Sequence, residues 1–287
     1  MSNSRVYIAI FLAVACMSTS SIIIKSTDAP AIVIAFYRVV FTTAMAFMIG
    51  NRQVVESARQ ISRRDWYYVI GAGLFLALHF AFWNTSLNFT SVSSSVLFTN
   101  LQVIFVLIFS LLFLREKLNR IATAGIMVAL LGSFFIVSGD MGAGKLFGDM
   151  LALLSGLFIA VYYIIGRNVR SRIDAVSYTC FTAGVAIIVL WVAVLLGKFS
   201  LTGYAPREWA LFFLLALAAG ICGHLVLNWS LKYVQAPIVS VSILGESVGA
   251  TILAWFIFSE YLMWYQIVGG LLILLGIYTA NTKSRQH

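Results

Sequence analysis

Residues 92–114 read VSSSVLFTNLQVIFVLIFSLLFL, a run of 23 residues that contains no charged side chain. It is followed at once by three charged residues, Arg115, Glu116 and Lys117. A helix of this length rises about 35 Å, which is enough to cross the roughly 30 Å hydrocarbon core of a bilayer. The segment is therefore predicted to be a membrane-spanning helix.

The rest of the chain consists of segments of the same kind. Of its 287 residues, 61% are hydrophobic and only 10% are charged, against roughly 25% charged in a soluble domain. Ten spans of about 20 residues leave loops that average about eight residues, which excludes an attached ATPase domain, a soluble receptor domain or a nucleic-acid module. The ten predicted spans are 6–24, 31–50, 66–87, 92–114, 121–138, 148–166, 175–197, 208–231, 236–258 and 264–281.

The basic residues predict the orientation. With loops assigned to alternate sides, fourteen of the 19 lysines and arginines fall on the side of both termini, four fall on the other side, and Arg38 lies inside a span. The side with the excess is the cytoplasmic one, so we expect a multi-pass protein of the cytoplasmic (inner) membrane with both termini inside. The net charge of +9 is then explained by a basic face next to anionic lipid, and no nucleic-acid partner is predicted.

The three cysteines do not indicate a site. Cys16, Cys180 and Cys222 lie in apolar segments without paired spacing or nearby histidine ligands. We therefore expect no disulfide framework, no metal site and no cofactor.

The second half of the chain repeats the first. With the sequence shifted by 144 residues, ten identities fall in a stretch of about 49 residues without a gap. They include the pairs Asn84 and Asn228, Glu116 and Glu260, Gly125 and Gly269, and Gly132 and Gly276. Each half holds five spans, and an odd number means that the second half enters the membrane from the opposite side. We expect an all-α fold of ten helices, with residues 1–140 and 145–287 as inverted repeats around a central cavity.

These features resemble a known family of transporters. Each half has a Glu soon after its fourth span and two glycines seven residues apart in its fifth, while Pro30 and Arg38 lie in the second span and Pro237 opens the ninth. This pattern is similar to the EamA family of the drug/metabolite transporter superfamily, over essentially the whole chain. The resemblance implies export of small metabolites, typically amino acids. The 14% aromatic content most resembles YddG-type exporters of aromatic amino acids.

Ionisable groups inside the spans are the candidates for substrate contact. Such a group costs roughly 2.5–3.5 kcal/mol on insertion scales, so it normally faces a cavity or a partner. An amino acid needs an anion acceptor, a cation acceptor and a surface for its side chain. Arg38 is expected to bind the carboxylate, Glu246 the ammonium, and His79 with Trp83 the side chain. The predicted substrate-binding residues are Arg38, His79, Trp83, Thr99, Gln102, Tyr163 and Glu246.

Structural interpretations compete with several of these assignments. Arg38 and Glu246 can instead pair with each other or with backbone carbonyls. His224, beside Gly220 and Gly223, is assigned to helix contact. The glycines of the fifth and tenth spans are assigned to helix packing, because small residues let membrane helices approach closely.

The predicted function is a secondary transporter that exports amino acids or related small metabolites by alternating access, without enzymatic activity. Three alternatives stay open: transport of another metabolite class such as drugs, nucleotide sugars or organic cations; a lipid-modifying membrane enzyme; and a passive channel. The partners expected are a small-molecule substrate and the lipid bilayer. The energy source, and whether the protein is a monomer or a homodimer, are left open by the sequence.

Overall fold

The structure is a computed structural model that describes residues 3–116, 118–140, 145–259 and 262–282. Within these ranges every regular element is a helix. Glu260, the predicted counterpart of Glu116, lies outside the described residues. The helices are α1 (Asn3–Met17), α2 (Ser20–Lys25), α3 (Ala31–Gln60), α4 (Arg63–Ser86), α5 (Val92–Asn100), α6 (Gln102–Phe109), the π-helix η1 (Ser110–Leu114), α7 (Arg120–Asp140), α8 (Leu146–Val169), α9 (Ala175–Leu196), α10 (Pro206–Leu215), the π-helix η2 (Ala216–Leu225), α11 (Val226–Ser230), α12 (Ala236–Ile243), α13 (Gly245–Phe258) and α14 (Trp264–Thr282).

The predicted spans correspond closely to these helices. In the described parts of the chain, nine helices are long and apolar enough to cross a membrane, some of them formed by consecutive elements such as α5, α6 and η1. The tenth is α7, whose described apolar part, Arg120–Ile136, is shorter. All predicted spans except the second agree with the structure within three residues at both ends.

The second span is longer than predicted. Residues 51–60, expected to be a charged loop, continue α3 as a helix as far as Gln60. Gly50 is the only residue of α3 with non-helical backbone angles, φ −140° and ψ 45°, and marks a kink. A Cβ at this position would lie 2.9 Å from Val176 Cγ1, so glycine lets the kinked helix approach α9. Beyond the kink Val54 is buried in a small cluster with Ala46 and Cys180, which holds the polar extension against the bundle.

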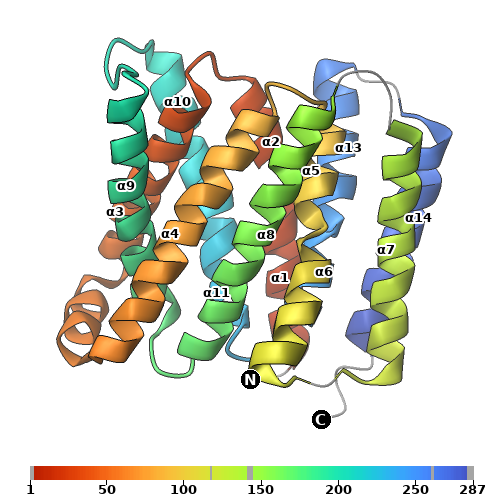
Figure 1. Cartoon of the computed structure of the whole chain (residues 1–287), viewed down its shortest axis with the longest axis horizontal. Helices are drawn as coiled ribbons and strands as arrows, with labels where there is room; N and C mark the ends of the chain where they lie inside the picture. The colour runs from red at the N-terminus through yellow and green to blue at the C-terminus, as the bar shows by residue number, and fades with distance from the viewer. Residues whose placement is uncertain (1–2, 117, 141–144, 260–261, 283–287) are drawn as a thin grey trace.

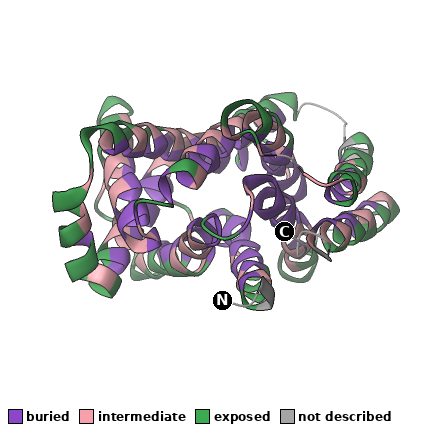
Figure 2. Ribbon diagram, turned by 90° about the horizontal axis from the view of Figure 1, so that it is seen from below, coloured by how far each residue is buried: buried purple, intermediate pink, exposed green. Residues whose placement is uncertain are grey.

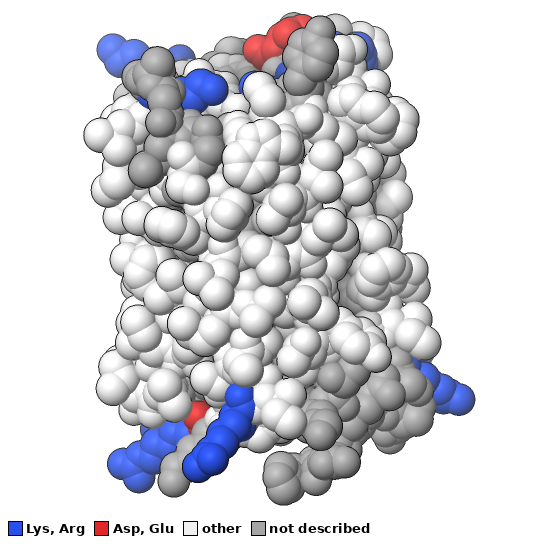
Figure 3. Space-filling model, turned by 90° about the vertical axis from the view of Figure 1, so that its right-hand side faces the viewer, with Lys and Arg blue, Asp and Glu red and all other residues white. Residues whose placement is uncertain are grey.

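The helices form one bundle with an apolar circumference. The start of α1 and the end of α14 lie at the same end of this bundle, called here the terminal end, and the other end is called the distal end (Figure 1). Buried residues face the middle of the bundle and exposed residues its periphery (Figure 2). On the face shown in Figure 3, charged side chains lie at the two ends and an uncharged band separates them. Large hydrophobic side chains such as Phe11, Met48 and Phe113, each more than 70% exposed, belong to this lipid-facing surface.

The fifth and tenth spans meet along a glycine seam. Helices α7 and α14 lie side by side at one edge of the bundle (Figure 1). A Cβ on Gly125 would lie 2.7 Å from Gly276 O, and a Cβ on Gly132 would lie 2.5 Å from Gly269 O. Only a backbone without side chains permits such an approach, so the assignment of these four glycines to helix packing is confirmed.

Candidate functional site

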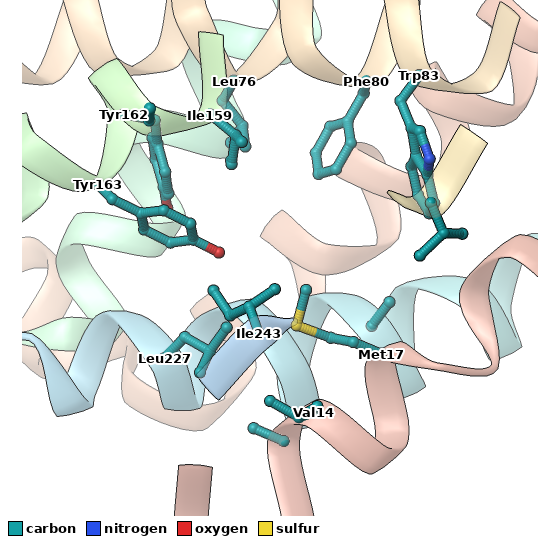
Figure 4. Packing of buried hydrophobic residues seen from close by; sticks show 14 of the residues in the cluster. Val14, Met17, Leu76, Phe80, Trp83, Ile159, Tyr162, Tyr163, Leu227 and Ile243 are labelled. Carbon is teal, nitrogen blue, oxygen red and sulfur yellow. The ribbon is translucent and has the colours of Figure 1, made fainter. Parts of the chain in front are cut away.

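A pocket in the middle of the bundle brings the predicted residues together. Arg38 comes from α3, His79 and Trp83 from α4, Thr99 from α5, Gln102 from α6, Tyr163 from α8 and Glu246 from α13, and all seven line this central pocket. Its wall is completed mainly by Met17, Ser20, Asn100, His224 and Ile243. In Figure 4, Met17, Trp83, Tyr163 and Ile243 surround this space from four different helices.

The central pocket is closed. None of the seven predicted side chains is more than 6% exposed. The cavity volume is about 20 Å³, which is room for a single water molecule. A metabolite therefore reaches these residues only after the helices move apart, and the structure is a contracted, occluded conformation.

Two interrupted helices, which pack against each other, contribute residues to the pocket. Helix α5 ends at Asn100 and α6 begins at Gln102, while α12 ends at Ile243 and α13 begins at Gly245. The breaks fall at Leu101 and Leu244, within one residue of corresponding places in the two halves of the sequence. Discontinuous helices of this kind line the substrate sites of transporters. Gln102 is the first residue after one break, and Glu246 is the second residue after the other.

Helices α5 and α8 are in close contact beside the pocket. A Cβ on Gly156 of α8 would lie 2.5 Å from Thr99 O, so glycine lets α8 approach the backbone of α5. Across this contact Thr99 Oγ1 donates a hydrogen bond of 3.2 Å to Ala152 O. The contact places Thr99 and Tyr163 on neighbouring walls.

Arg38 is buried without an ionic partner. Its Cζ lies 4.1 Å from the centre of the Phe80 ring and 5.7 Å from that of Trp83, so two aromatic faces support the guanidinium. Its Nε and Nη1 have no hydrogen-bond partner. Among the described residues no ion pair joins Arg38 to Glu246, so the pairing expected as a structural alternative does not form in this conformation.

Other polar atoms at the same place are also unpartnered. Buried atoms of Ser20, Trp83, Gln102 and His224 have no hydrogen-bond partner: Oγ, Nε1, Oε1 and Nδ1 respectively. A buried polar group without a partner costs several kcal/mol in a membrane interior. Donors and acceptors that converge on one pocket, and are not paired with each other, are therefore available to a polar ligand or to water.

His79 is held in a fixed orientation. Its Nδ1 lies 2.7 Å from Ser155 Oγ and 3.2 Å from Ser155 O, and Ser155 Oγ also donates to His79 O. The imidazole stacks on Trp83 with an interplanar angle of 11° and a centroid distance of 6.0 Å. Together with His224 and Tyr163, these rings give the pocket an aromatic wall.

The pocket residues that were not among those predicted include His224 and Asn100. His224 was assigned to helix contact, but it lies in η2, lines the pocket and has its ring 6.3 Å from that of His79. Asn100 was overlooked, although its Nδ2 donates to Ser247 Oγ at 3.0 Å and so connects α5 with α13. The signal for His224 was present, since an ionisable group in a span is by default a functional candidate. For Asn100 the break at Leu101 changes the face that a regular helix would present.

A charged cluster joins three spans at the terminal end. Glu116 Oε1 accepts a hydrogen bond of 2.7 Å from Arg167 Nε, at the end of α8. Its Oε2 accepts from Ser110 Oγ at 2.7 Å and from the backbone N of Ala236, the first residue of α12, at 3.2 Å. Arg167 also donates to Leu231 O. The carboxylate thus ties the end of the fourth span to the sixth and to the start of the ninth.

Metal ligands do not cluster in the part of the chain that the structure describes. No group of three His, Cys, Asp or Glu side chains there is close enough together to hold an ion. The chemistry of the pocket is therefore that of its arginine, carboxylate, histidine and amide groups.

A helical bundle of bilayer thickness, with discontinuous helices around a buried polar pocket, is the architecture of a membrane transporter. The chain belongs to the EamA-like transporter family of the drug/metabolite transporter superfamily, which it matches over residues 4–138 and again over residues 146–282. The division into repeats 1–140 and 145–287, and their inverted relation, remain predictions.

Some relatives of known sequence match over nearly their whole length. An uncharacterized transporter of Archaeoglobus fulgidus is 22% identical and covers 99% of this chain and 100% of the relative. The pseudopaline exporter CntI of Pseudomonas aeruginosa is 24% identical, with 96% of both chains covered. A solved crystal structure has a TM-score of 0.76 at 19% identity over 96% of both chains, which supports the fold.

Proposed function

We propose that this protein exports zwitterionic amino acids, or closely related small metabolites, across the cytoplasmic membrane by alternating access. The terminal end faces the cytoplasm in this proposal, in agreement with the excess of basic residues on that side. A similar protein of Pseudomonas aeruginosa is named as an exporter, which supports this direction. Transport changes no covalent bond of the substrate, so no enzymatic activity is proposed.

One observation carries the choice of substrate: a buried arginine and a buried carboxylate line the same closed pocket without an ion pair between them. Arg38 Nε and Nη1 are unpartnered, and each can donate a charge-assisted hydrogen bond to an anionic group such as a carboxylate. Glu246 lines the pocket from α13 and can accept the ammonium group. An α-amino acid carries a carboxylate and an ammonium group on the same carbon atom, so one molecule can pair with Arg38 and Glu246 at once.

The remaining walls favour an apolar or aromatic side chain. Trp83, His79 and His224 present ring faces and edges, and Met17 and Ile243 add apolar surface. The Trp83 Nε1 and Gln102 Oε1 atoms provide one donor and one acceptor beside them. Aromatic amino acids are therefore the first substrates to examine, because stacking on such rings adds about 0.5–1.5 kcal/mol to apolar burial.

Alternating access explains why the pocket is closed at present. When the substrate binds, its charges replace the missing partners of the pocket. The halves then rearrange, and we propose that the Glu116 cluster seals the cytoplasmic side whenever the pocket opens to the outside. The helix breaks at Leu101 and Leu244, within one residue of corresponding positions, support such an exchange between the two halves.

The test is flux of labelled amino acids from proteoliposomes that contain the purified protein. We expect saturable flux for at least one aromatic amino acid. Arg38→Gln should lower kcat/KM about a hundredfold, because two charge-assisted hydrogen bonds are lost. Arg38→Lys should recover only part of this loss, since an ammonium cannot form the paired bonds. Glu246→Gln should lower it at least about tenfold.

Arg52→Gln is the matched control, because Arg52 is an exposed arginine on the extension of α3 and lines no pocket. Its flux should equal that of the wild type. Absence of saturable flux for every amino acid examined, with protein shown to be folded by its melting transition, would rule out the proposed substrate class. Flux that Arg38→Gln and Glu246→Gln leave unchanged would rule out the proposed site.

A further inference from the structure

A second hollow lies at the distal end of the bundle. Its polar lining includes Lys25, Thr27, Asn84, Asn88, Ser91 and Lys145, and its volume is about 600 Å³. This distal vestibule is in the size range of small-molecule sites, roughly 300–1,000 Å³, whereas the central pocket is contracted. Unlike the central pocket, it is large enough for a metabolite in the conformation described.

The distal vestibule lies directly next to the central pocket. On each of three spans one residue lines the vestibule and the residue one turn away lines the pocket. These pairs are Ile24 and Ser20, Ile34 and Arg38, and Leu87 and Trp83. Four residues of helix correspond to about 6 Å. A molecule in the vestibule is therefore separated from Arg38 by a single layer of side chains.

The charges of the vestibule are of one sign. Lys25 and Lys145 are exposed, and the described residues that line the hollow include no aspartate or glutamate. Two acids lie nearby. Asp28, between the lining residues Thr27 and Ala29, is exposed and lies 3.9 Å from Arg207. Asp149 is occupied by hydrogen bonds from Thr90 Oγ1 at 2.7 Å and Ser94 Oγ at 2.8 Å. Neither lysine forms an ion pair within the described ranges. Both ammonium groups are thus available to an anion.

A buried acceptor lies in the same hollow. Asn84 is 0% exposed and lines the vestibule. Its Nδ2 donates to Ala31 O at 3.2 Å, while its Oδ1 has no hydrogen-bond partner. Two cations together with an unpartnered carbonyl-type acceptor match a molecule that carries a carboxylate and an ammonium group.

The corresponding place in the second half is closed. Asn228, the sequence counterpart of Asn84, donates to Tyr162 Oη at 2.6 Å and to Thr179 Oγ1 at 3.0 Å. Arg170, only 3% exposed, covers it by donating to Asn228 O at 2.9 Å. The vestibule is therefore a property of the first half and of the distal end, and does not follow from the repeat.

We propose that the distal vestibule is a second, weaker substrate site, in which Lys25 and Lys145 hold the carboxylate of an amino acid and Asn84 receives its ammonium group. This inference rests on the proposed function, because it places the exported molecule in the vestibule on its way out. The same site can be occupied by substrate outside the cell and then opposes further export.

Protection of an introduced thiol tests the site directly. Thr27→Cys places a thiol in the vestibule, and Ser200→Cys places one in the exposed loop after α9 at the same end. The rate of labelling by uncharged N-ethylmaleimide is measured for each thiol by mass spectrometry, with and without L-phenylalanine as the probe. Its concentration is about 10 mM, which exceeds a dissociation constant in the millimolar range, as expected for a weak site. Phenylalaninamide, which lacks the carboxylate, is the matched control ligand.

We expect phenylalanine to slow labelling at position 27 and not at position 200, and phenylalaninamide to have no effect. Adding Lys25→Gln and Lys145→Gln to Thr27→Cys should raise the half-protecting concentration about fourfold, since each of the two exposed ion pairs contributes a factor of about two. Equal protection by the amide, protection that survives loss of both lysines, or none with phenylalanine would overturn the proposal.

Flux measured on the same preparations separates the two proposals. Saturable export that depends on Arg38, without protection at position 27, refutes the vestibule site and leaves the proposed function standing. Protection that depends on the lysines, without saturable export of any amino acid, refutes the proposed function and supports a carboxylate site in the vestibule.

Discussion

The Glu116 cluster offers a quantitative test of how the terminal end closes. Its contacts join the fourth, sixth and ninth spans, and they break if those spans separate. Glu116→Ala removes the ion pair with Arg167, whose side chain is 25% exposed against 10% for Glu116. It also removes the acceptor for the backbone N of Ala236 at the start of α12.

The magnitude follows from these two losses. A partly exposed ion pair contributes about 1 kcal/mol after allowance for solvent screening. Loss of a carboxylate that caps a helix N-terminus costs about 1 kcal/mol. Together about 2 kcal/mol favour opening at the terminal end, which is a factor of about 30 in the equilibrium between closed and open forms.

The assay is thiol accessibility of the central pocket. Thr99→Cys places a thiol in the pocket wall, in a background without the three native cysteines, and an impermeant thiol reagent is added on the side of the terminal end. We expect Glu116→Ala to increase the labelling rate of the thiol at position 99 by about the same factor of 30, as long as the open form is the less populated of the two forms.

Asp65→Asn is the matched control. Asp65 and Arg172 form a 2.8 Å ion pair that connects α4 to the segment after α8, and the pair contacts neither α6 nor α12. Its loss should leave the labelling rate unchanged. If Glu116→Ala has no larger effect than Asp65→Asn, the cluster is not a closure and the reasoning from its contacts is wrong.

Three further predictions concern packing and pocket geometry. Gly276→Ala should destabilise the protein by about 1–3 kcal/mol and lower its melting temperature, because the new Cβ would lie 2.5 Å from the backbone across the α7–α14 seam. Gly184→Ala, with open space around the position, should leave the melting temperature unchanged or raise it. If both substitutions lower the melting temperature equally, the close packing of α7 on α14 is not what requires glycine at position 276. Ser155→Ala should raise KM with little change in melting temperature, because it releases His79 Nδ1; an unaltered KM would show that this hydrogen bond positions nothing for substrate. Trp83→Phe keeps the ring and removes the unpartnered Nε1 donor, so it should raise KM by about threefold to tenfold, and a KM equal to that of the wild type would mean that no substrate atom accepts from it.

The sequence alone predicted the membrane-spanning helices, because the length and hydropathy of a span are local properties. A segment such as 92–114 has to satisfy its backbone within itself and cover the thickness of the hydrocarbon, whatever its neighbours are. The sequence also indicated which side chains matter. Arg38, His79 and Glu246 are too polar to face lipid, and the structure places them around one pocket. Their role in binding substrate remains a prediction.

Tertiary structure decided what depends on partners distant in the chain. Residues 51–60 are helical because Val54 packs against α9, and a window of polar residues shows no sign of that contact. His224 was assigned to helix contact because of the neighbouring glycines, and Asn100 was not considered; both line the central pocket, His224 from the π-helix η2 and Asn100 from the end of α5 before the break at Leu101. The open distal vestibule beside a closed central pocket is likewise a relation between spans. Local sequence determines that a helix forms and crosses the membrane, whereas the packing of one helix on another determines which of its faces meets the substrate.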